Sequence, residues 1–261
     1  KLKSLNGDTP YDRWLEEKTN DILSSIDLLQ SSGTKQFLKK SEQIYGSPNF
    51  VLRDGKTTTL NLAKKFEFLI DSHLKYFSES LQVNPIPVSK VKKKIEERVQ
   101  PIFGSKSPKI IIEDHLSARA TASSKRIRLR KGASFTNKDV DQLINHEAFI
   151  HVATTLNGRS QSNVKILGSK TGSITKTQEG LAVFSEFITG CIDVNRMYRI
   201  SDRVIAIQMA IDGADFIEVY RFFLKRKGKT RTQAFEDARR VFRGGVLTGG
   251  APFTKDIVYL D

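Results

Sequence analysis

The stretch that decides the fold is His146-Glu-Ala-Phe-Ile-His151, which is followed further along the chain by Thr177-Gln-Glu-Gly-Leu-Ala182. The chain has only four histidines, and two of them around a glutamate at this short spacing rarely arise by chance. Imidazole nitrogen and carboxylate oxygen suit Zn²⁺, which keeps one position for water in catalytic sites. We therefore predict one zinc ion, bound by His146, His151 and Glu179.

The spacing of the two histidines requires a local change in the helix that carries them. The familiar His-Glu-x-x-His sequence places its histidines about 40° apart around an α-helix. In this chain they are one residue further apart, which corresponds to about 140° on an ideal α-helix and is too wide for one metal ion. We therefore predict a π-bulge between Glu147 and His151, which would turn both rings to the same side.

Side chains next to the predicted ligands indicate catalytic and supporting roles. Glu147 directly follows the first ligand, so its carboxylate can reach a water beside the metal and act as the general base. Glu179 is expected on the next long helix, which would face the helix of the histidines. Glu186 lies two helical turns further along the same face, and it and Gln178 are candidate partners of the ligand histidines.

The remaining pattern predicts a mostly helical chain with a small sheet. Apolar residues recur at helical spacing in residues 11–80 and 91–99. Residues 109–113 and 119–130 are rich in β-branched residues and are predicted to form two strands. In the second of these, Ile127 and Leu129 alternate with arginines, which predicts one buried face and one wet face near the edge of a sheet.

Helical spacing returns after the strands. Thr136-Asn-Lys-Asp139 resembles a capping box and is predicted to start the helix of His146. Later helices are predicted at residues 177–199, 201–211, 215–227 and 230–242. The fold class is therefore α+β, with a small sheet beside the zinc-binding helix. We expect an N-terminal helical region or cap at residues 1–100 and a catalytic domain at residues 101–261.

Charge and composition restrict the partners. The formal net charge of +14 favours acidic partners, but the basic stretches 90–94, 125–131, 225–231 and 239–243 are interpreted as solvated faces. No stretch is apolar for long enough to cross a bilayer, so we expect no membrane partner. The single cysteine, Cys191, is expected to be a buried thiol in a reducing compartment, and the protein is expected to be cytoplasmic.

Four motifs together resemble those of a known family. They are Asn145-His-Glu-x-x-x-His151, Thr177-Gln-Glu-Gly-Leu-Ala182, Arg240-Val-Phe-Arg-Gly-Gly245 and Phe253-Thr-Lys-Asp256. They resemble the QEGLA-motif proteins of bacteria, which are often labelled flavohemoglobin expression-modulating and are similar to the eukaryotic microtubule-associated tyrosine carboxypeptidases (MATCAP). The resemblance covers residues 109–260. It implies a zincin-like metallopeptidase fold, the same three zinc ligands and the same catalytic glutamate.

The resemblance also implies an activity. The eukaryotic relatives remove a C-terminal tyrosine from tubulin tails, which implies a metallocarboxypeptidase that acts on the C-terminal tail of a peptide or protein. Such an enzyme must bind the terminal carboxylate, for which Arg243 and Lys255 are candidates beside the glycine-rich loop 244–250. Tyr220 is a candidate to stabilise the oxyanion by a hydrogen bond. The basic net charge agrees with an acidic tail.

The sequence also allows two alternatives. The first is a zinc endopeptidase or amidase, which would lack a cationic residue that closes the site beyond the zinc. The second is a basic module that binds nucleic acid or protein through a site whose metal is not catalytic. Nucleic acid is disfavoured as a partner, because the basic stretches lack interleaved aromatic residues for base stacking and no nucleic-acid motif appears.

Overall fold

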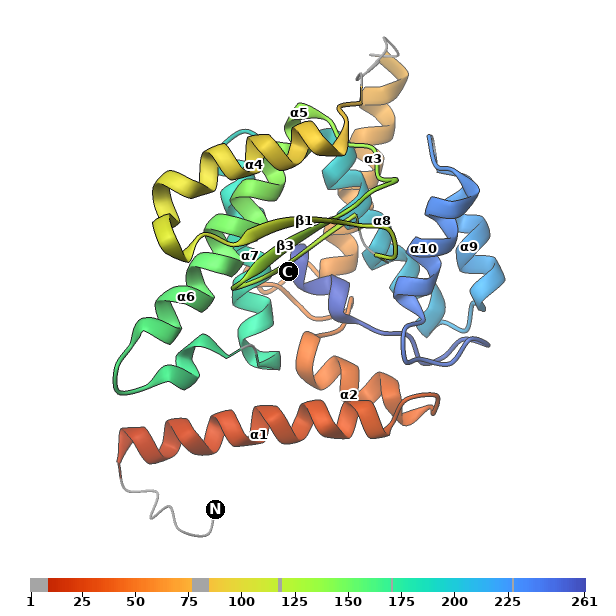
Figure 1. The fold of residues 1–261 in the computed structure, drawn as a ribbon. Helices are drawn as coiled ribbons and strands as arrows, with labels where there is room; N and C mark the ends of the chain where they lie inside the picture. The colour runs from red at the N-terminus through yellow and green to blue at the C-terminus, as the bar shows by residue number, and fades with distance from the viewer. Residues whose placement is uncertain (1–8, 77–84, 117–118, 170, 227) are drawn as a thin grey trace. The chain divides into compact units, whose positions relative to one another are not determined.

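Helices make up most of the structure (Figure 1), as the spacing of the apolar residues predicts. The computed structural model describes residues 9–76, 85–116, 119–169, 171–226 and 228–261. Before the sheet lie α1 (Pro10–Gln30), α2 (Gln36–Tyr45), α3 (Thr59–Tyr76), α4 (Val88–Phe103) and the short helix η2 (Gly104–Lys106). After it lie α5 (Asn137–Leu143), η3 (Ile144–Val152), α6 (Ala153–Ser160), η4 (Lys165–Gly168), α7 (Gly172–Ile188), α8 (Val194–Ile211), α9 (Phe216–Leu224), α10 (Arg231–Val241) and η5 (Lys255–Tyr259). The end of the helical region predicted at residues 11–80 falls outside the described residues.

The chain divides into two compact units, each built from separated segments. The first unit comprises residues 1–69, 171–177 and 198–261, and the second comprises residues 70–170 and 178–197. The predicted metal ligands His146, His151 and Glu179 all belong to the second unit. The role of residues 1–100 as a cap stays a prediction.

The second unit contains a three-stranded sheet in the order β1-β3-β2. In it, β3 (Arg126–Arg130) runs parallel to β1 (Lys109–Glu113) and antiparallel to β2 (Ala120–Ser123). Residues 119–130 therefore form two strands, and the prediction of one was wrong. The chain turns back after Ser123, whose hydroxyl accepts a hydrogen bond from the backbone N–H of Arg126 at 3.2 Å. As a result β3 is the central strand and does not lie near the edge of the sheet. One of its faces is buried and the other is partly exposed to solvent, as predicted.

The sheet packs against α4 and η3, the helix that carries the two histidines. One core cluster joins these elements: Val91, Ile95 and Val99 of α4, Ile110 of β1, Ile127 and Leu129 of β3, and Ile144, Ala148 and Val152 of η3. Full burial of a Val, Leu or Ile side chain contributes about 1.5–3 kcal/mol. The core therefore fixes one face of η3. The direction of its opposite face is then fixed as well.

The start of α5 has the predicted capping box. The Thr136 hydroxyl accepts from the backbone N–H of Asp139 at 3.1 Å, and the Asp139 carboxylate accepts from the backbone N–H of Thr136 at 2.8 Å. Arg119 also binds this carboxylate, at 2.9 Å. Burial alone would raise the pKa of Asp139, but the bonds from Arg119 and Thr136 lower it below its usual value.

The break between α7 and α8 lies earlier than the sequence predicted. The predicted helix 177–199 is interrupted, because α7 ends at Ile188 and α8 begins at Val194. Gly190 adopts φ 68°, a left-handed conformation that ends a helix. Asp193 then caps α8, since its side chain accepts from the backbone N–H of Arg196 at 2.6 Å.

The glycine-rich loop 244–250 is shaped by packing within the first unit. A Cβ at Gly245 would lie 2.2 Å from the carbonyl oxygen of Ala251, and one at Gly249 would lie 2.4 Å from that of Gly213. Gly249 also has φ 90°, which side chains rarely tolerate. These glycines are therefore explained by close approach of the chain to itself, without a ligand.

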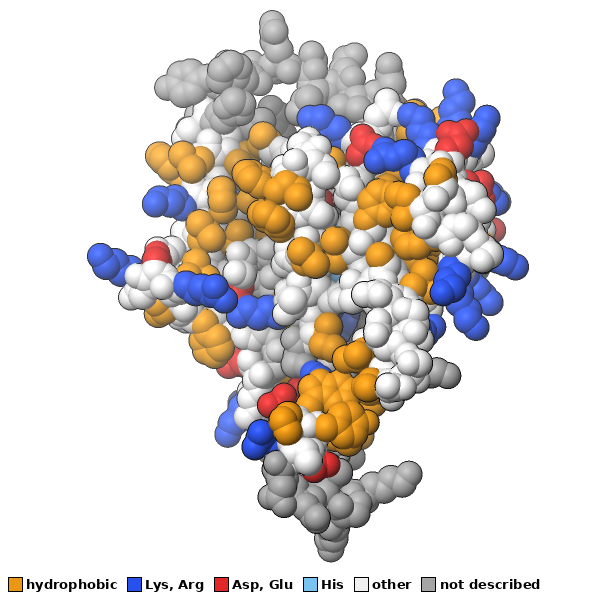
Figure 2. All heavy atoms as spheres, turned by 90° about the vertical axis from the view of Figure 1, so that its left-hand side faces the viewer, with side chains coloured by type: hydrophobic (Ala, Val, Ile, Leu, Met, Phe, Trp, Pro, Cys, Tyr) orange, Lys and Arg blue, Asp and Glu red, His pale blue; other side chains and the backbone are white. Residues whose placement is uncertain are grey.

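Several side chains of the basic stretches are paired with carboxylates. In α4, Lys92 and Lys93 pair with Glu96 and Glu97 one turn further on. Similar pairs are Lys131 with Asp114, Arg226 with Glu67, Lys229 with Asp237, Arg239 with Glu236 and Arg240 with Asp256. On the face shown in Figure 2, Lys and Arg side chains are interspersed with acidic, hydrophobic and uncharged ones. Within the described ranges, none of the helices combines the length and hydropathy that crossing a bilayer requires.

Gly158 of α6 provides a test of the packing in the second unit. A Cβ there would lie 2.5 Å from the backbone carbon of Leu167, so the overpacking in Gly158→Ala should lower the free energy of unfolding by about 1–3 kcal/mol. Gly180 of α7 has no such neighbour, so Gly180→Ala should raise it by up to about 1 kcal/mol through helix propensity. Thermal unfolding of the metal-free proteins measures both. A stabilised Gly158→Ala variant would contradict the packing of η4 on α6.

Candidate metal centre

The two histidines lie in a π-helix, so the predicted π-bulge is confirmed. η3 spans Ile144–Val152 and has the wider turn in which residues five apart are hydrogen-bonded neighbours. The rings of His146 and His151 therefore lie one turn apart on one side of the helix, edge to face at an interplanar angle of 80°, with their centroids 4.9 Å apart. Both are almost fully buried.

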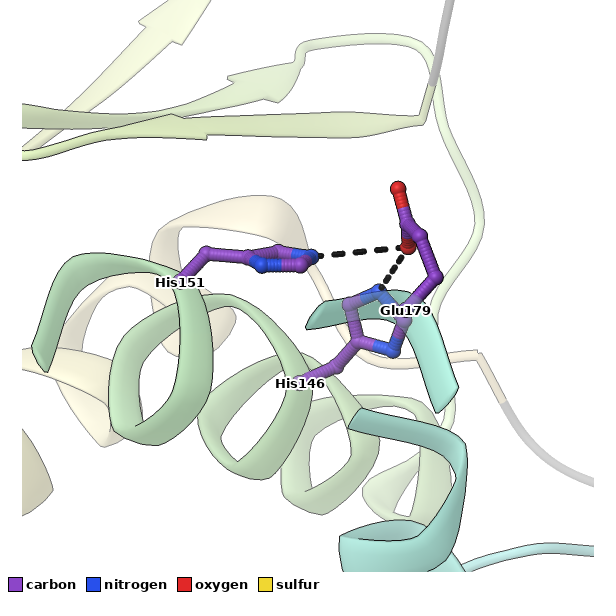
Figure 3. A group of neighbouring side chains, drawn as sticks. All are labelled: His146, His151 and Glu179. Atoms are coloured by element: carbon purple, nitrogen blue, oxygen red, sulfur yellow. Dashed lines mark hydrogen bonds and ion pairs between the residues drawn. The ribbon is translucent and has the colours of Figure 1, made fainter. Parts of the chain in front are cut away.

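Glu179 of α7 completes a group of three possible metal ligands, with ligand atoms that all lie within 4.8 Å of one another. Figure 3 shows the two imidazole rings and the carboxylate converging from η3 and α7. Glu179 Oε2 lies 3.2 Å from His146 Nε2 and 3.5 Å from His151 Nε2. Tetrahedral coordination with bonds of about 2.0–2.1 Å places donor atoms roughly 3.3 Å apart. The donor types and the two distances from Glu179 therefore fit a tetrahedral metal ion of this size.

Nδ1 of each histidine, the ring nitrogen that does not face Glu179, has an oxygen partner. His146 Nδ1 lies 2.7 Å from Glu186 Oε1, and His151 Nδ1 lies 3.0 Å from Gln178 Oε1. Because these oxygens accept, each Nδ1 donates, and the Nε2 atoms face Glu179. Gln178 and Glu186 thus contact the two histidines in the way their positions in the sequence suggested.

The site attracts positive charge. Burial lowers the pKa of His146, but hydrogen bonds to Glu179 and Glu186 outweigh it and raise the pKa to about 9. Burial raises the pKa of Glu186, yet His146 and Arg196 hold it below its usual value. Without a metal ion, a proton on His146 therefore balances the carboxylates, and a bound cation would take its place.

Glu147 follows His146 in η3 and is half-buried. Its negative charge helps to raise the pKa of His146, which places the carboxylate close to the ligand group. It is not a member of that group. A general base must reach a water beside the metal rather than the metal itself, and this role of Glu147 stays a prediction.

Sequence reasoning missed Arg196 and Asn145. Arg196 donates from Nε to Glu186 Oε2 and from Nη2 to Glu186 Oε1, both at 3.1 Å. Asn145 Nδ2 donates to Thr189 Oγ1 at 3.1 Å, which ties η3 to the end of α7. The one available signal was the position of Asn145 directly before the first ligand.

The three candidate substrate-binding residues lie in the first unit. Tyr220 of α9 is half-buried against its core, and Arg243 is exposed in the turn after α10. Lys255 begins η5, with Nζ 5.5 Å from the centroid of the Tyr259 ring. Their roles stay predictions.

The two late motifs are joined by an ion pair. Arg240 Nη2 donates to Asp256 Oδ1 at 2.8 Å, and a second bond runs from Arg240 Nε to the other carboxylate oxygen. This pair gives Arg240 and Asp256 a structural role in the first unit. It also fixes the loop between them, next to which Arg243 and Lys255 lie.

A mostly helical fold with a small mixed sheet and a buried His-His-Glu group defines a zincin-like metallopeptidase. A comparison with known protein families matches residues 2–261 to the family described as microtubule-associated tyrosine carboxypeptidase, MATCAP. The chain therefore belongs to this family of metallocarboxypeptidases. The match extends well beyond residues 109–260, where the motifs suggested it. A search of curated proteins returned no match.

Metal affinity should depend on pH through His146. Below its pKa of about 9 the ring carries a proton that the metal must displace, so zinc affinity should rise about tenfold per pH unit and level off above about pH 9. Because the pKa is raised from 6.5, this proton stabilises the metal-free fold at low pH, and the contribution is lost as the pH rises through about 9. Competition with a chelator measures the affinity, and His146→Ala, which should lose the ion, is the control. An affinity that stays constant from neutral pH to pH 9 would contradict the linkage.

Proposed function

We propose that this protein is a zinc-dependent metallocarboxypeptidase that removes the C-terminal residue, tyrosine or a similar one, from an acidic tail of a cytoplasmic protein. The observation that carries the proposal is the His146, His151 and Glu179 group, with ligand atoms within 4.8 Å of one another and Glu147 directly after the first histidine. Membership of the tyrosine carboxypeptidase family over residues 2–261 supports the reaction.

The catalytic roles follow from the positions of the side chains. Zn²⁺, when bound, lowers the pKa of water towards neutrality and polarises a carbonyl group. His146, His151 and Glu179 would hold the ion, and Gln178 and Glu186, which contact Nδ1 of the two rings, would orient them. Glu147 accepts the proton of the attacking water and returns it to the leaving amine.

The sheet offers a surface for the substrate backbone. β2 lies against η3, and among the described strands it pairs on one side only, with β3. An extended peptide can add to such an edge through main-chain hydrogen bonds. This arrangement would bring a peptide beside the helix of His146 and Glu147.

Recognition of a chain end requires a cation for the terminal carboxylate. We assign this role to Arg243 and Lys255, and oxyanion stabilisation to Tyr220. The exposed position of Arg243 leaves its guanidinium accessible to a carboxylate. The net charge of +14 favours an acidic tail, and the buried free thiol of Cys191 agrees with a reducing compartment.

Replacement of Glu147 should separate metal binding from catalysis. Glu147→Gln keeps the shape of the side chain but cannot accept a proton, so kcat should fall by about 100-fold or more while zinc content stays that of wild type. The assay measures release of tyrosine from an acidic peptide that ends in tyrosine, and a matched peptide with a basic tail tests the preference for charge. Full activity of Glu147→Gln, or cleavage of internal bonds alone, would refute the proposal.

Replacement of the proposed carboxylate-binding residues should affect recognition of the chain end. Arg243→Gln and Lys255→Gln should each raise KM for a peptide with a free C-terminus by about 10- to 100-fold, because a charge-assisted hydrogen bond is lost. Wild type should leave the same peptide uncut when its C-terminus is amidated. Arg239→Gln is the matched control, since Arg239 lies on α10 and pairs with Glu236. Equal KM values for all variants would remove Arg243 and Lys255 from the site.

A further inference from the structure

The contacts of Glu186 point to a further residue that organises the metal centre. We propose that Arg196 is a positioning residue: its guanidinium fixes the Glu186 carboxylate, which in turn orients His146 towards the metal ion. The inference rests on the metal site of the proposed function and is independent of peptide cleavage.

Glu186 needs a fixed partner because it is fully buried, with an exposed fraction of 0%. A carboxylate removed from water is costly unless it is paired and hydrogen-bonded. Arg196, itself 9% exposed, meets both carboxylate oxygens, from Nε and Nη2, at 3.1 Å each. Such a paired contact allows the carboxylate one orientation only.

That orientation is passed on to the ligand. Glu186 Oε1, which accepts from Arg196, also accepts from His146 Nδ1 at 2.7 Å. With Nδ1 held there, the imidazole ring points Nε2 towards Glu179 Oε2, 3.2 Å away. A rotation of the Glu186 carboxylate would therefore rotate the ring and move Nε2 away from the other ligands.

Arg196 is held in turn by the corner between α7 and α8. Its backbone N–H donates to Asp193, which starts α8. The backbone carbonyl of Glu186 accepts from the N–H groups of Cys191 and Ile192 at 3.0 and 3.1 Å. The corner thus holds the main chain of Glu186 while Arg196 holds its side chain.

A merely structural ion pair is the competing explanation, and the chain offers a matched control for it. Arg226 of the first unit is also mostly buried and paired with carboxylates, with Nε 2.9 Å from Asp202 Oδ1 and a second contact to Glu67. Neither of these carboxylates belongs to the group of possible metal ligands. Loss of Arg226 should therefore lower stability without an effect on the metal.

The experiment measures zinc affinity of the full chain by chelator competition, with thermal unfolding of the metal-free proteins and the absorption spectrum of bound Co²⁺. Arg196→Gln should weaken zinc binding by about 10- to 100-fold, as is typical when a partner of a metal ligand is lost. Arg196→Lys should show a smaller loss, because an ammonium keeps the charge but cannot form the paired contact. Both should alter the Co²⁺ spectrum, whereas Arg226→Gln should be less stable but have the affinity and spectrum of wild type.

Wild-type zinc affinity and an unchanged Co²⁺ spectrum in the Arg196 variants would overturn the inference and leave the proposed function standing. If Arg196→Gln does not fold, Arg196→Lys decides by the same comparison. A wild-type chain that binds no zinc would overturn both proposals.

Discussion

The site depends on one geometrical constraint, which is that two histidines five residues apart must reach the same point. An α-helix cannot meet this constraint, and the chain forms a π-helix over Ile144–Val152 instead. The wider turn is unusual, and packing holds it in place. Ile144, Ala148 and Val152 anchor one side of η3 in the core shared with the sheet and α4. The small sheet therefore serves first as the support on which the histidine helix is shaped.

A second constraint is electrostatic. Glu179 and Glu186 both bind His146, and Glu147 lies close by, so three carboxylates surround a nearly buried ring. Burial of this much negative charge is unfavourable unless cations accompany it. Arg196 provides one fixed cation, and the remaining position belongs to a proton or a metal ion. The same carboxylates that fix the rings therefore favour the binding of a cation.

The group of possible metal ligands and the π-helix could be predicted because rare residue types at an unusual spacing leave few arrangements. The helices were predictable from apolar periodicity, and the start of α5 from its capping box. The contact of Arg196 with Glu186 could not be predicted. On the continuous helix expected at residues 177–199, Arg196 would lie about 15 Å along the axis from Glu186. The chain instead turns between α7 and α8, where Gly190 is left-handed, and Arg196 contacts Glu186. The division into two units of separated segments could not be predicted either, because contacts between distant segments produce no periodic pattern in a sequence.

The first unit is built from segments that lie far apart in the sequence, and this affects the order in which the chain can fold during synthesis. The Ser41 and Thr254 hydroxyls are hydrogen-bonded at 2.9 Å, although 213 positions separate them. Such distant pairing is entropically costly and slow to form. The segments of the second unit emerge from the ribosome before residues 198–261, and they can assemble first. The helix α2 must meanwhile wait for a partner that is translated 213 residues later, so the histidine helix can be in place while the first unit is still incomplete.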